Sequence, residues 1–316
     1  KDGKLVAATW PEAFAAIAEK LSGLPGDRIG AVAGALADAE STLALKDLMA
    51  AYGSANLDCR DDFAAIDVSR PEFYRFNTTI AGIDEADALL IIGSDVRREA
   101  PVLNARIRKR WTQGKFKAGF VGPRGVDLTY PATYLGDGPQ AMNAFAETLK
   151  AAEKPMIILG RGALARADGA AVLAAAWALA AEVGALKADW HGFNLLHLFG
   201  GQVGALELGF VPGPGGKDLN AMLSGGVDAL WLLNADGFDP SRIPASTFVV
   251  YQGHHGDAMA GRADVILPGA AYTEKEATWV NTEGRAQRGR LAIFPPGEAK
   301  EDWRIIRAFS EGVGKT

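Results

Sequence analysis

Short apolar runs recur along this sequence, each followed by a turn and a helical pattern. Residues 88–92, Ala-Leu-Leu-Ile-Ile, contain no polar side chain and lead into Gly93. A run that is apolar at every position is typical of a parallel strand buried on both faces, because a strand with one solvated face alternates polar and apolar residues. The pattern therefore predicts an α/β fold with mostly parallel, doubly wound sheets.

Seven runs of this kind are spaced along the chain. We expect strands at residues 28–33, 88–92, 117–121, 156–159, 229–233, 248–251 and 265–267. Apolar residues at helical spacing predict helices at residues 5–21, 35–52, 101–111 and 168–183, the first one capped by Thr9 to Glu12. Two long irregular stretches, residues 56–79 and 190–216, are expected to be loops, the second with a short helix.

Two pairs of segments suggest an internal duplication. Residues 34–39, Gly-Ala-Leu-Ala-Asp-Ala, resemble residues 162–167, Gly-Ala-Leu-Ala-Arg-Ala, and both follow an expected strand. Residues 87–92 resemble residues 228–233 in the same way, with Asp-Ala-Leu at the start of each. We therefore expect two sheet lobes related by a pseudo-repeat.

The boundary between these lobes is expected near Lys150, in the stretch 149–155. This places a first α/β lobe at residues 1–150 and a second at residues 151–316. The second lobe would include a C-terminal Asn-x-Glu-Gly-Arg segment at residues 281–285.

The supply of cysteine and histidine limits the chemistry of this chain. An iron–sulfur cluster needs about four thiolates, and Cys59 is the one cysteine among 316 residues. A catalytic zinc ion takes about three protein ligands, but His254 and His255 are adjacent, and the other histidines, His191 and His197, lie far away in the sequence. We therefore expect no cluster, no disulfide and no metal site within this chain.

Charge and hydropathy exclude two further classes of function. The net charge is −5 with 22% charged residues, and basic residues gather only at 106–110, so nucleic acid is not an expected partner. The longest apolar run, residues 169–186, is mostly alanine and contains Glu182, so we expect a buried helix rather than a membrane span. No signal peptide is visible at Lys1, and the abrupt start suggests a fragment.

Two turns between a strand and a helix are candidate binding sites for a phosphate group. Gly93, Ser94 and Asp95 follow one expected strand, and Gly160 and Arg161 follow another. Glycine at such a turn lets a phosphate approach the N–H groups at the start of a helix. Neither turn forms the G-x-G-x-x-G fingerprint, and glycine is common in any strand-to-helix turn, so the structural interpretation stays open beside the binding one.

Polar residues beyond the last expected strand, 265–267, form the other candidate site. Glu283 and Arg285, with Glu274 and Asn281, could clamp a polar ligand or could form an internal ion-pair network. His254 follows the strand at 248–251 and could face the same edge of a sheet. No catalytic triad or G-x-S-x-G motif is present, so we expect no catalytic residue.

The stretch from 263 to 285 resembles the molybdopterin oxidoreductase superfamily. The resemblance rests on Ala-Asp before an apolar run ending in Leu-Pro, then Glu274, then Asn-x-Glu-Gly-Arg. Further segments are similar, more narrowly, to the family of the large iron–sulfur subunit of respiratory complex I, NADH:quinone oxidoreductase. These segments are Glu-Ala-Pro-Val-Leu-Asn-Ala-Arg-Ile-Arg at 99–108, Tyr-Gln-Gly-His-His-Gly-Asp at 251–257, Pro-Pro-Gly at 295–297 and Glu-Asp-Trp at 301–303.

The resemblance implies a role within an assembly that passes electrons from NADH through iron–sulfur clusters to quinone and couples this to proton translocation. It implies a non-catalytic scaffold in the hydrophilic, peripheral arm, contacting other subunits there. The clusters would belong to an N-terminal portion of the parent subunit, and this portion would bind no cofactor. The expected location is the cytoplasmic side of a bacterial inner membrane, or the mitochondrial matrix side.

The two glycine turns then correspond to places where molybdopterin enzymes hold the halves of a pterin dinucleotide. The vestiges of that site would be Gly93, Ser94, Asp95, Gly160, Arg161, His254, Glu283 and Arg285. In these relatives the first turn commonly reads Gly-x-Asn-Pro, whereas Asp95-Val96 stand here, which argues against cofactor binding.

Two other functions compete with this one. The chain could be the catalytic fragment of a working molybdopterin-dependent oxidoreductase, such as a formate dehydrogenase-like enzyme, but Cys59 lies in no matching metal-ligand motif. It could also be a free-standing nucleotide-binding protein, which would need a self-sufficient phosphate loop.

Overall fold

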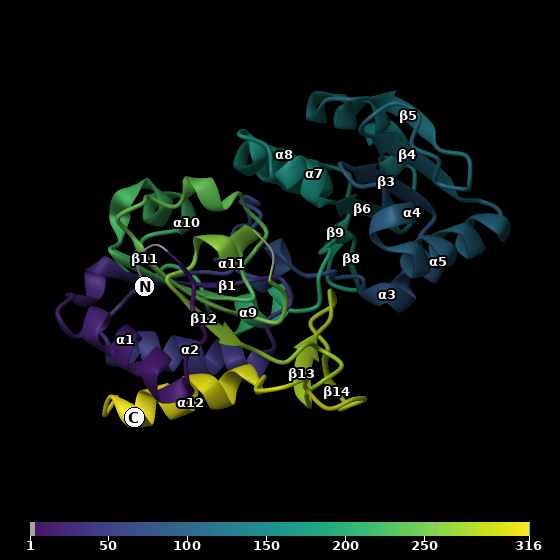
Figure 1. The fold of residues 1–316 in the computed structure, drawn as a ribbon. Coiled ribbons are helices and arrows are strands. Elements are labelled where there is room, and N and C mark those ends of the chain that lie inside the picture. The colour runs from purple at the N-terminus through teal and green to yellow at the C-terminus, as the bar shows by residue number, and fades with distance from the viewer. Residues whose placement is uncertain (1–3, 257, 316) are drawn as a thin grey trace. The chain divides into compact units, whose positions relative to one another are not determined.

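The chain folds into two compact units, each built around a five-stranded parallel sheet (Figure 1). The computed structural model describes residues 4–256 and 258–315. Unit 1 comprises Lys1–Phe63, Phe199–Asn281 and Ala286–Thr316, and unit 2 comprises Ala64–Leu198 and Thr282–Arg285. Parallel sheets that alternate with helices confirm the predicted α/β class.

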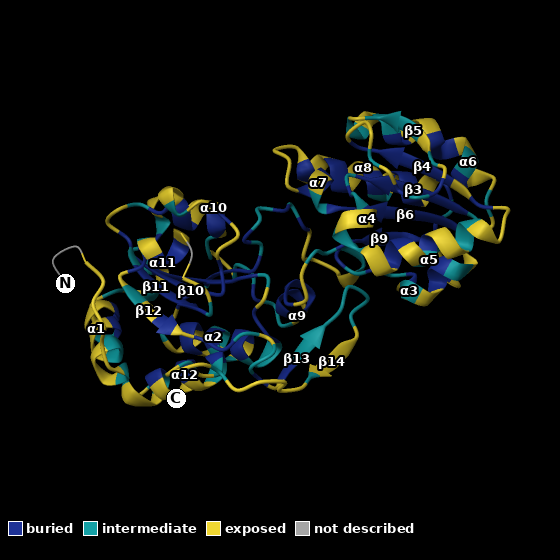
Figure 2. Cartoon of the chain, turned by 45° about the vertical axis from the view of Figure 1, so that its right-hand side comes forward, coloured by how far each residue is buried: buried dark blue, intermediate teal, exposed yellow. Residues whose placement is uncertain are grey.

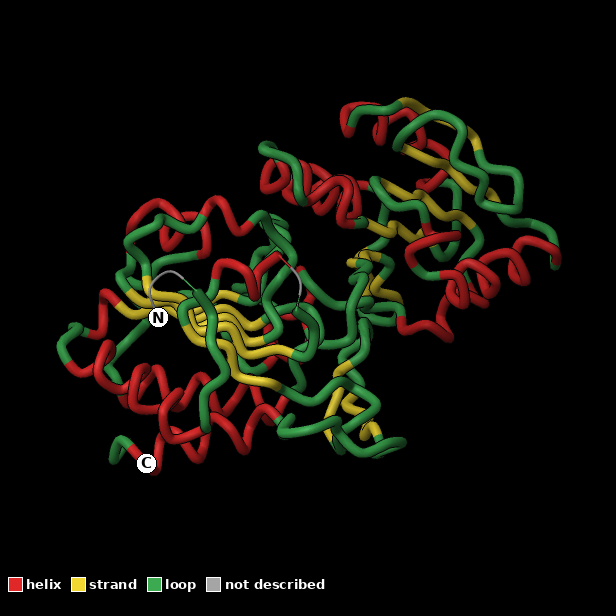
Figure 3. Tube along the Cα trace, viewed as in Figure 1, coloured by secondary structure: helices red, strands yellow, loops and turns green. Residues whose placement is uncertain are grey.

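The sheet of unit 1, whose strands are yellow in Figure 3, has the strand order β12-β11-β10-β1-β2. Its strands are β1 (Ile29–Ala33), β2 (Asn56–Asp58), β10 (Ala229–Leu233), β11 (Phe248–Gly253) and β12 (Val265–Pro268). The long helices α1 (Trp10–Ser22), α2 (Ala39–Ala51) and α12 (Asp302–Gly312) lie on one face, and the short α10 (Leu219–Ala221) and α11 (Ala258–Arg262) lie on the other. The unit also contains α9 (Gln202–Glu207) and the antiparallel pair β13 (Ala277–Val280) and β14 (Ala286–Gly289).

The sheet of unit 2 has the strand order β5-β4-β3-β6-β9. Its strands are β3 (Ala88–Ile92), β4 (Lys117–Val121), β5 (Thr133–Gly136), β6 (Pro155–Leu159) and β9 (Phe193–Leu195). Its helices are α3 (Thr79–Gly82), α4 (Val96–Glu99), α5 (Pro101–Thr112), α6 (Ala146–Lys150), α7 (Arg161–Leu164) and α8 (Gly169–Glu182), and β7 (Leu186–Lys187) pairs with β8 (Trp190–His191).

Four inner strands are buried along their whole length, and the other two, β4 and β11, are buried except at their first residue. Every residue of β1, β3, β6 and β10 is buried, and β3, β6 and β10 are dark blue in Figure 2. By contrast, the edge strand β5 has no buried residue. Burial on both faces explains why the inner strands appear in the sequence as uninterrupted apolar runs.

The expected division near Lys150 is wrong, because each sheet takes strands from both sides of that residue. In unit 1, Ile29 of β1 pairs with Ala229 of β10, and in unit 2, Ala88 of β3 pairs with Pro155 of β6. The units therefore do not correspond to residues 1–150 and 151–316. Instead, residues 64–198 of unit 2 form a continuous insertion between β2 and β10 of unit 1.

The two sheets nevertheless repeat one strand order, and the matched sequences occupy equivalent places in it. The segment 34–39 follows β1 and the segment 162–167 follows β6, and β1 and β6 are the fourth strands in their sheets as written above. The similar segments 87–92 and 228–233 contain β3 and β10, the two third strands. This agreement supports the predicted pseudo-repeat of the sheets, although its units are not contiguous halves.

Three strands that complete the sheets have no counterpart among the predicted strands. β2 falls in the stretch 56–79, β9 falls in the stretch 190–216, and β5 was not expected. β2 and β9 contain only three residues each, and β5 contains four. Such short strands carry too little periodic signal to be distinguished from loops. The short helix expected within 190–216 is α9.

The alanine-rich stretch 169–186 forms the 14-residue helix α8 and the approach to β7. Among the residues that the structure describes, none of the helices combines the length and the apolar composition of a membrane span.

A buried lysine joins several elements of unit 1. The ammonium group of Lys275, whose side chain is 2% exposed, lies 2.7 Å from Oδ2 of both Asp38 and Asp302. Asp38 also caps α2 by accepting the N–H of Ser41, and Asp302 accepts a hydrogen bond from Gln252 of β11. Burial disfavours the charged lysine, but Asp302 and Asp38 outweigh this effect and raise the pKa of Lys275. One cation thereby ties α2 and α12 to the sheet.

Lys275→Met is expected to destabilise unit 1 by about 3–5 kcal/mol, because it leaves two buried carboxylates without their cation. The neighbouring change Glu276→Gln removes only exposed ion pairs with Arg288 and Arg290, so it should cost less than about 1 kcal/mol. Urea unfolding of both variants measures the difference. Equal losses for the two variants would contradict the assigned role of Lys275.

Candidate functional site

Each sheet has a point where the strand order reverses, and open α/β sheets bind ligands at the carboxyl ends of the strands there. In unit 2 this point lies between β3 and β6, because β4 and β5 continue from β3 in one direction and β6 pairs on its other side. Gly93 follows β3 and Gly160 follows β6, and the N–H of Gly160 donates to the carbonyl of Ile92 at 2.9 Å. The structure therefore brings the two predicted turns together.

The glycines of these turns are explained by close packing of the turns on each other. A Cβ atom at Gly160 would lie 2.4 Å from Cβ of Ser94, and one at Gly162 would lie 2.7 Å from the carbonyl oxygen of Gly93. Gly93 has a positive φ of 66°, and a Cβ there would meet the backbone nitrogen of Ala163 at 2.5 Å. Backbone of the same chain thus occupies the approach that glycine would offer a phosphate.

A carboxylate takes the hydrogen-bond donors of the first turn. Oε2 of Glu99 accepts the Ser94 hydroxyl at 2.6 Å, and Oε1 accepts the N–H of Asp95 at 3.2 Å. Ser94 is 2% exposed. A second carboxylate belongs to this turn, since Asp95 is part of it and its Oδ1 is buried. The donors that would receive a phosphate are therefore already bound to an anionic group of the chain.

Unit 1 repeats this arrangement with a different residue. Its reversal point lies between β10 and β1, and the turns there contain Gly237 and Ala35. The carboxylate of Asp61, which is 4% exposed, accepts the N–H groups of both residues. A Cβ atom at Gly237 would lie 2.8 Å from Oδ2 of Asp61. Asp61 therefore accepts turn donors in unit 1 as Glu99 does in unit 2, although Asp61 follows the fifth strand of its sheet, β2, and Glu99 follows the third, β3.

Asp61 is buried, and the carboxylates of Asp62 and Asp236 act on it. Burial, together with the charges of Asp62 and Asp236, raises the pKa of Asp61 to about 7, and the N–H groups of Ala35 and Gly237 only partly oppose this. A phosphate brought to this edge would meet further negative charge, so the electrostatics disfavour an anionic ligand.

A pterin dinucleotide carries phosphate groups, and neither reversal point suits them. In both units an internal carboxylate accepts the turn donors, and in unit 2 the turns also pack backbone against backbone. The residues present therefore do not fit the cofactor at these positions. Glu99 and Asp61 were not among the residues singled out from the sequence, because only the fold places their carboxylates over distant turns.

Glu283 and Arg285 belong to unit 2, although the strand that precedes them in the sequence, β12, belongs to unit 1. Oε2 of Glu283 accepts the N–H of Ile80, in α3, at 2.7 Å, and its Oε1 lies 3.3 Å from the guanidinium of Arg285. The Glu283 side chain is 8% exposed. These contacts agree with the internal ion-pair interpretation, and the expectation that these residues follow β12 at one sheet edge is wrong.

His254 lies in unit 1, just beyond the end of β11. Its Nδ1 faces Nδ1 of His255, and burial followed by the charge of His255 lowers the pKa of His254. Asp257, the last residue of the motif at 251–257, lies outside the described residues. Among the residues that are described, no group of three or more His, Cys, Asp or Glu side chains is arranged to hold a metal ion.

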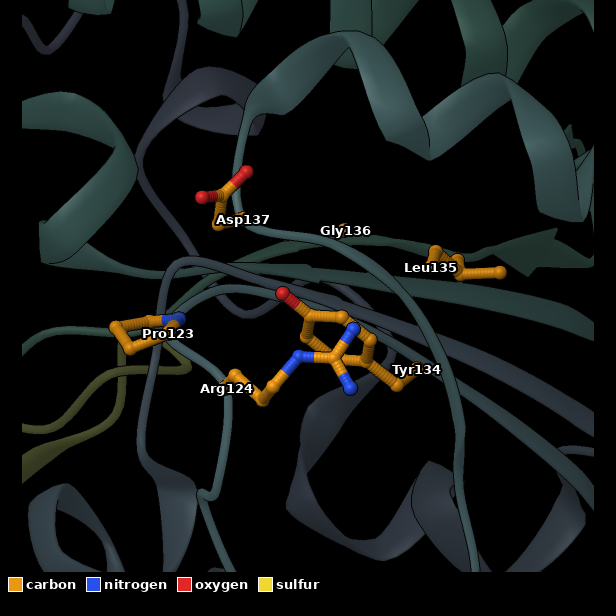
Figure 4. Close-up of a pocket in the computed structure, with 6 residues that line it drawn as sticks. All are labelled: Pro123, Arg124, Tyr134, Leu135, Gly136 and Asp137. Atoms are coloured by element: carbon orange, nitrogen blue, oxygen red, sulfur yellow. The ribbon is translucent and has the colours of Figure 1, made fainter.

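An open pocket of about 710 Å³ lies in unit 2 beyond the carboxyl ends of β4 and β5 (Figure 4). The guanidinium of Arg124 stacks over the ring of Tyr134 at 4.6 Å from its centroid. Pro123, Leu135, Gly136 and Asp137 complete the lining. This pocket shares no lining residue with the turns at the β3–β6 reversal point, and none of its lining residues is among the candidates predicted from the sequence.

Gly160→Ala should lower the free energy of unfolding of unit 2 by about 1–3 kcal/mol, because its methyl group would overlap Ser94 and Gly93. Gly23→Ala is the matched control, since a Cβ atom there meets nothing within 4 Å. Thermal unfolding followed by hydrogen exchange of β3 and β6 gives the comparison. A neutral Gly160→Ala would show that the turns are not in close contact.

Asp61→Asn should flatten the pH dependence of stability between about pH 4 and 7. The pKa of Asp61 is raised in the folded state, so the folded protein binds the proton more tightly than the unfolded chain does. Stability therefore falls as the pH rises through this window, and the cost, up to roughly 4 kcal/mol, is complete above about pH 7. The variant should consequently gain stability at pH 8 and not at pH 4.

Asp27→Asn serves as the control for this experiment, because Asp27 is an exposed carboxylate in the same unit. Urea unfolding at several pH values measures both variants. A slope that persists in Asp61→Asn would assign the titration to another group.

Comparison with known proteins agrees with the fold. The family model described as molybdopterin oxidoreductase matches residues 1–312. The chain also resembles, at 14% identity and a TM-score of 0.72, acetylene hydratase from Pelobacter acetylenicus, covering 99% of this chain and 60% of that one. A structure of the formyltransferase/hydrolase complex from Methylorubrum extorquens gives 16% identity and a TM-score of 0.70, covering 99% of this chain and 98% of that one.

Curated relatives are more similar in sequence. An iron–sulfur protein 1 of mitochondrial NADH dehydrogenase [ubiquinone] from Solanum tuberosum is 40% identical over 99% of this chain and 42% of its own length. The 78 kDa subunit of NADH-ubiquinone oxidoreductase from Candida albicans is 42% identical over 98% of this chain and 43% of its length. An NADH-quinone oxidoreductase subunit from Rickettsia felis is 40% identical over 98% of this chain and 46% of its length.

The chain thus spans less than half the length of these relatives. The match of the family model along nearly the whole chain and the paired parallel sheets lead to one conclusion. The chain belongs to the molybdopterin oxidoreductase family.

Proposed function

We propose that this chain is the molybdopterin-oxidoreductase-like portion of the large iron–sulfur subunit of respiratory complex I, and that it acts there as a non-catalytic scaffold. The names of relatives about 40% identical to it support the assignment to NADH:quinone oxidoreductase. In this assignment the complex transfers electrons from NADH to quinone and couples the transfer to proton translocation, while this portion takes part in no chemical step.

The observation that carries the scaffold role is the placement of Glu99 and Asp61. Both carboxylates accept hydrogen bonds from backbone N–H groups at the reversal points, where a member of this fold would bind an anionic cofactor. The remnants of a pterin site would then be Gly93, Ser94, Asp95, Gly160, Arg161, His254, Glu283 and Arg285. Hydrogen-bond donors at the two turns would now stabilise the fold instead of binding a cofactor. This argues against the competing role as a working molybdopterin enzyme.

Partners and location follow from the same assignment. The chain would contact other subunits of the hydrophilic arm, and the iron–sulfur clusters would lie in the part of the subunit that it does not span. It would sit peripherally on the cytoplasmic side of a bacterial inner membrane, or on the matrix side in mitochondria.

Metal and pterin content of the full-length subunit, purified within its complex from native membranes, tests this function. We expect iron without stoichiometric molybdenum, tungsten or pterin, measured by elemental analysis and by fluorescence of the oxidised pterin. Gly160→Ala should leave NADH:quinone activity per assembled complex unchanged, because no cofactor depends on that turn. Stoichiometric pterin and metal would instead establish the working enzyme.

A further inference from the structure

A short segment of unit 1 presents large apolar side chains to solvent. Leu291 is 40% exposed, Ile293 is 58% exposed and Phe294 is 85% exposed. Tyr272, 62% exposed, precedes Thr273, whose carbonyl oxygen accepts the N–H groups of Ala292 and Ile293 at 2.9 and 3.2 Å. These four residues, Tyr272, Leu291, Ile293 and Phe294, therefore lie on neighbouring strands of backbone, and we call them the Phe294 surface.

The backbone that carries the Phe294 surface is held in place at both ends. Before it, β14 pairs with β13, and after it the N–H of Lys300 donates to the carbonyl of Pro268, at the end of β12. Pro295 and Pro296 restrict the backbone dihedrals of the intervening turn. Single exposed apolar side chains are ordinary, whereas four on two hydrogen-bonded stretches of restrained backbone favour a surface that another polypeptide covers.

The charges beside the Phe294 surface indicate the chemistry of what covers it. Arg288 and Arg290, 58% and 74% exposed, share the one carboxylate of Glu276. Arg288 lies 2.6 Å from this carboxylate and is also influenced by the charge of Glu40, whereas Arg290 lies 3.4 Å from it, so Arg290 is the less fully neutralised of the two arginines. A complementary surface would offer an apolar pocket bordered by a carboxylate, the arrangement in which aromatic and arginine residues contribute most to binding.

The length of the relatives indicates where that complementary surface lies. Each relative carries more than half of its polypeptide outside the region that this chain matches. A polypeptide joined to this unit reaches it at a high effective concentration, so it is favoured as the occupant over a separate protein. We propose that the Phe294 surface docks the part of the subunit that this chain does not span, with Phe294 in an apolar pocket and Arg290 beside a carboxylate. This inference rests on the proposed function.

Site-specific photo-crosslinking in the full-length subunit tests the proposal. The crosslinking amino acid p-benzoylphenylalanine replaces Phe294, and in a control it replaces Val102, which is also 85% exposed but lies on α5 of unit 2. After irradiation of the purified complex, mass spectrometry identifies the joined peptides. We expect position 294 to crosslink to a peptide of the same polypeptide outside the region equivalent to residues 1–316, with at least about tenfold higher yield than position 102.

Four outcomes would overturn the proposal: a crosslink from position 294 to a separate subunit, one to a second copy, one to residues 64–198, or the same peptide in equal yield from position 102. Copurification of the subunit with NADH:quinone activity is measured before irradiation and reports on the proposed function alone. The crosslink within one polypeptide can also be measured on the isolated full-length subunit. Failure of the docking proposal can therefore be distinguished from failure of the proposed function.

Discussion

The parallel pairing of β1 with β10 is the constraint on which the organisation of this chain depends. Ile29 pairs with Ala229, and Arg28, just before β1, forms a bidentate ion pair with Asp228, just before β10. Parallel strands need a crossover connection, and here that connection contains all of residues 64–198. Unit 2 is therefore inserted in unit 1. The chain leaves unit 1 after β2 and must return to it before β10 can pair with β1.

This pairing also creates the reversal point of unit 1, and the β3–β6 pairing creates its counterpart in unit 2. Both points carry an internal carboxylate on donors that could hold an anion, Asp61 in one and Glu99 in the other. The two sheets share one strand order, and in each of them a different acidic residue accepts the N–H groups at the reversal point. These carboxylates satisfy N–H donors that would otherwise be left without a partner in the folded protein, which is consistent with the proposed scaffold role.

The sequence predicted the inner strands well and the domain boundary poorly. The strands at 88–92, 117–121 and 229–233 have the predicted bounds, because strands buried on both faces admit almost no polar residue. The boundary at Lys150 failed because contiguity in sequence says nothing about which parallel strand lies beside which. Among the site residues, both turns lie between a strand and a helix, as predicted, but only the fold shows that they meet, and Glu283 belongs to unit 2 and not to the edge at β12.

The sequence by itself determined the α/β class, the repeat of two related sheets and the resemblance to a molybdopterin-type fold, because local apolar patterns and short motifs encode these features directly. Only the tertiary structure decided that Lys275 lies between Asp38 and Asp302, and that Asp61 and Glu99 fill the reversal points. Asp and Lys residues have the same one-dimensional appearance whether exposed or buried. Their role depends on burial and on partners brought from distant segments, and the packing of the sheets sets both.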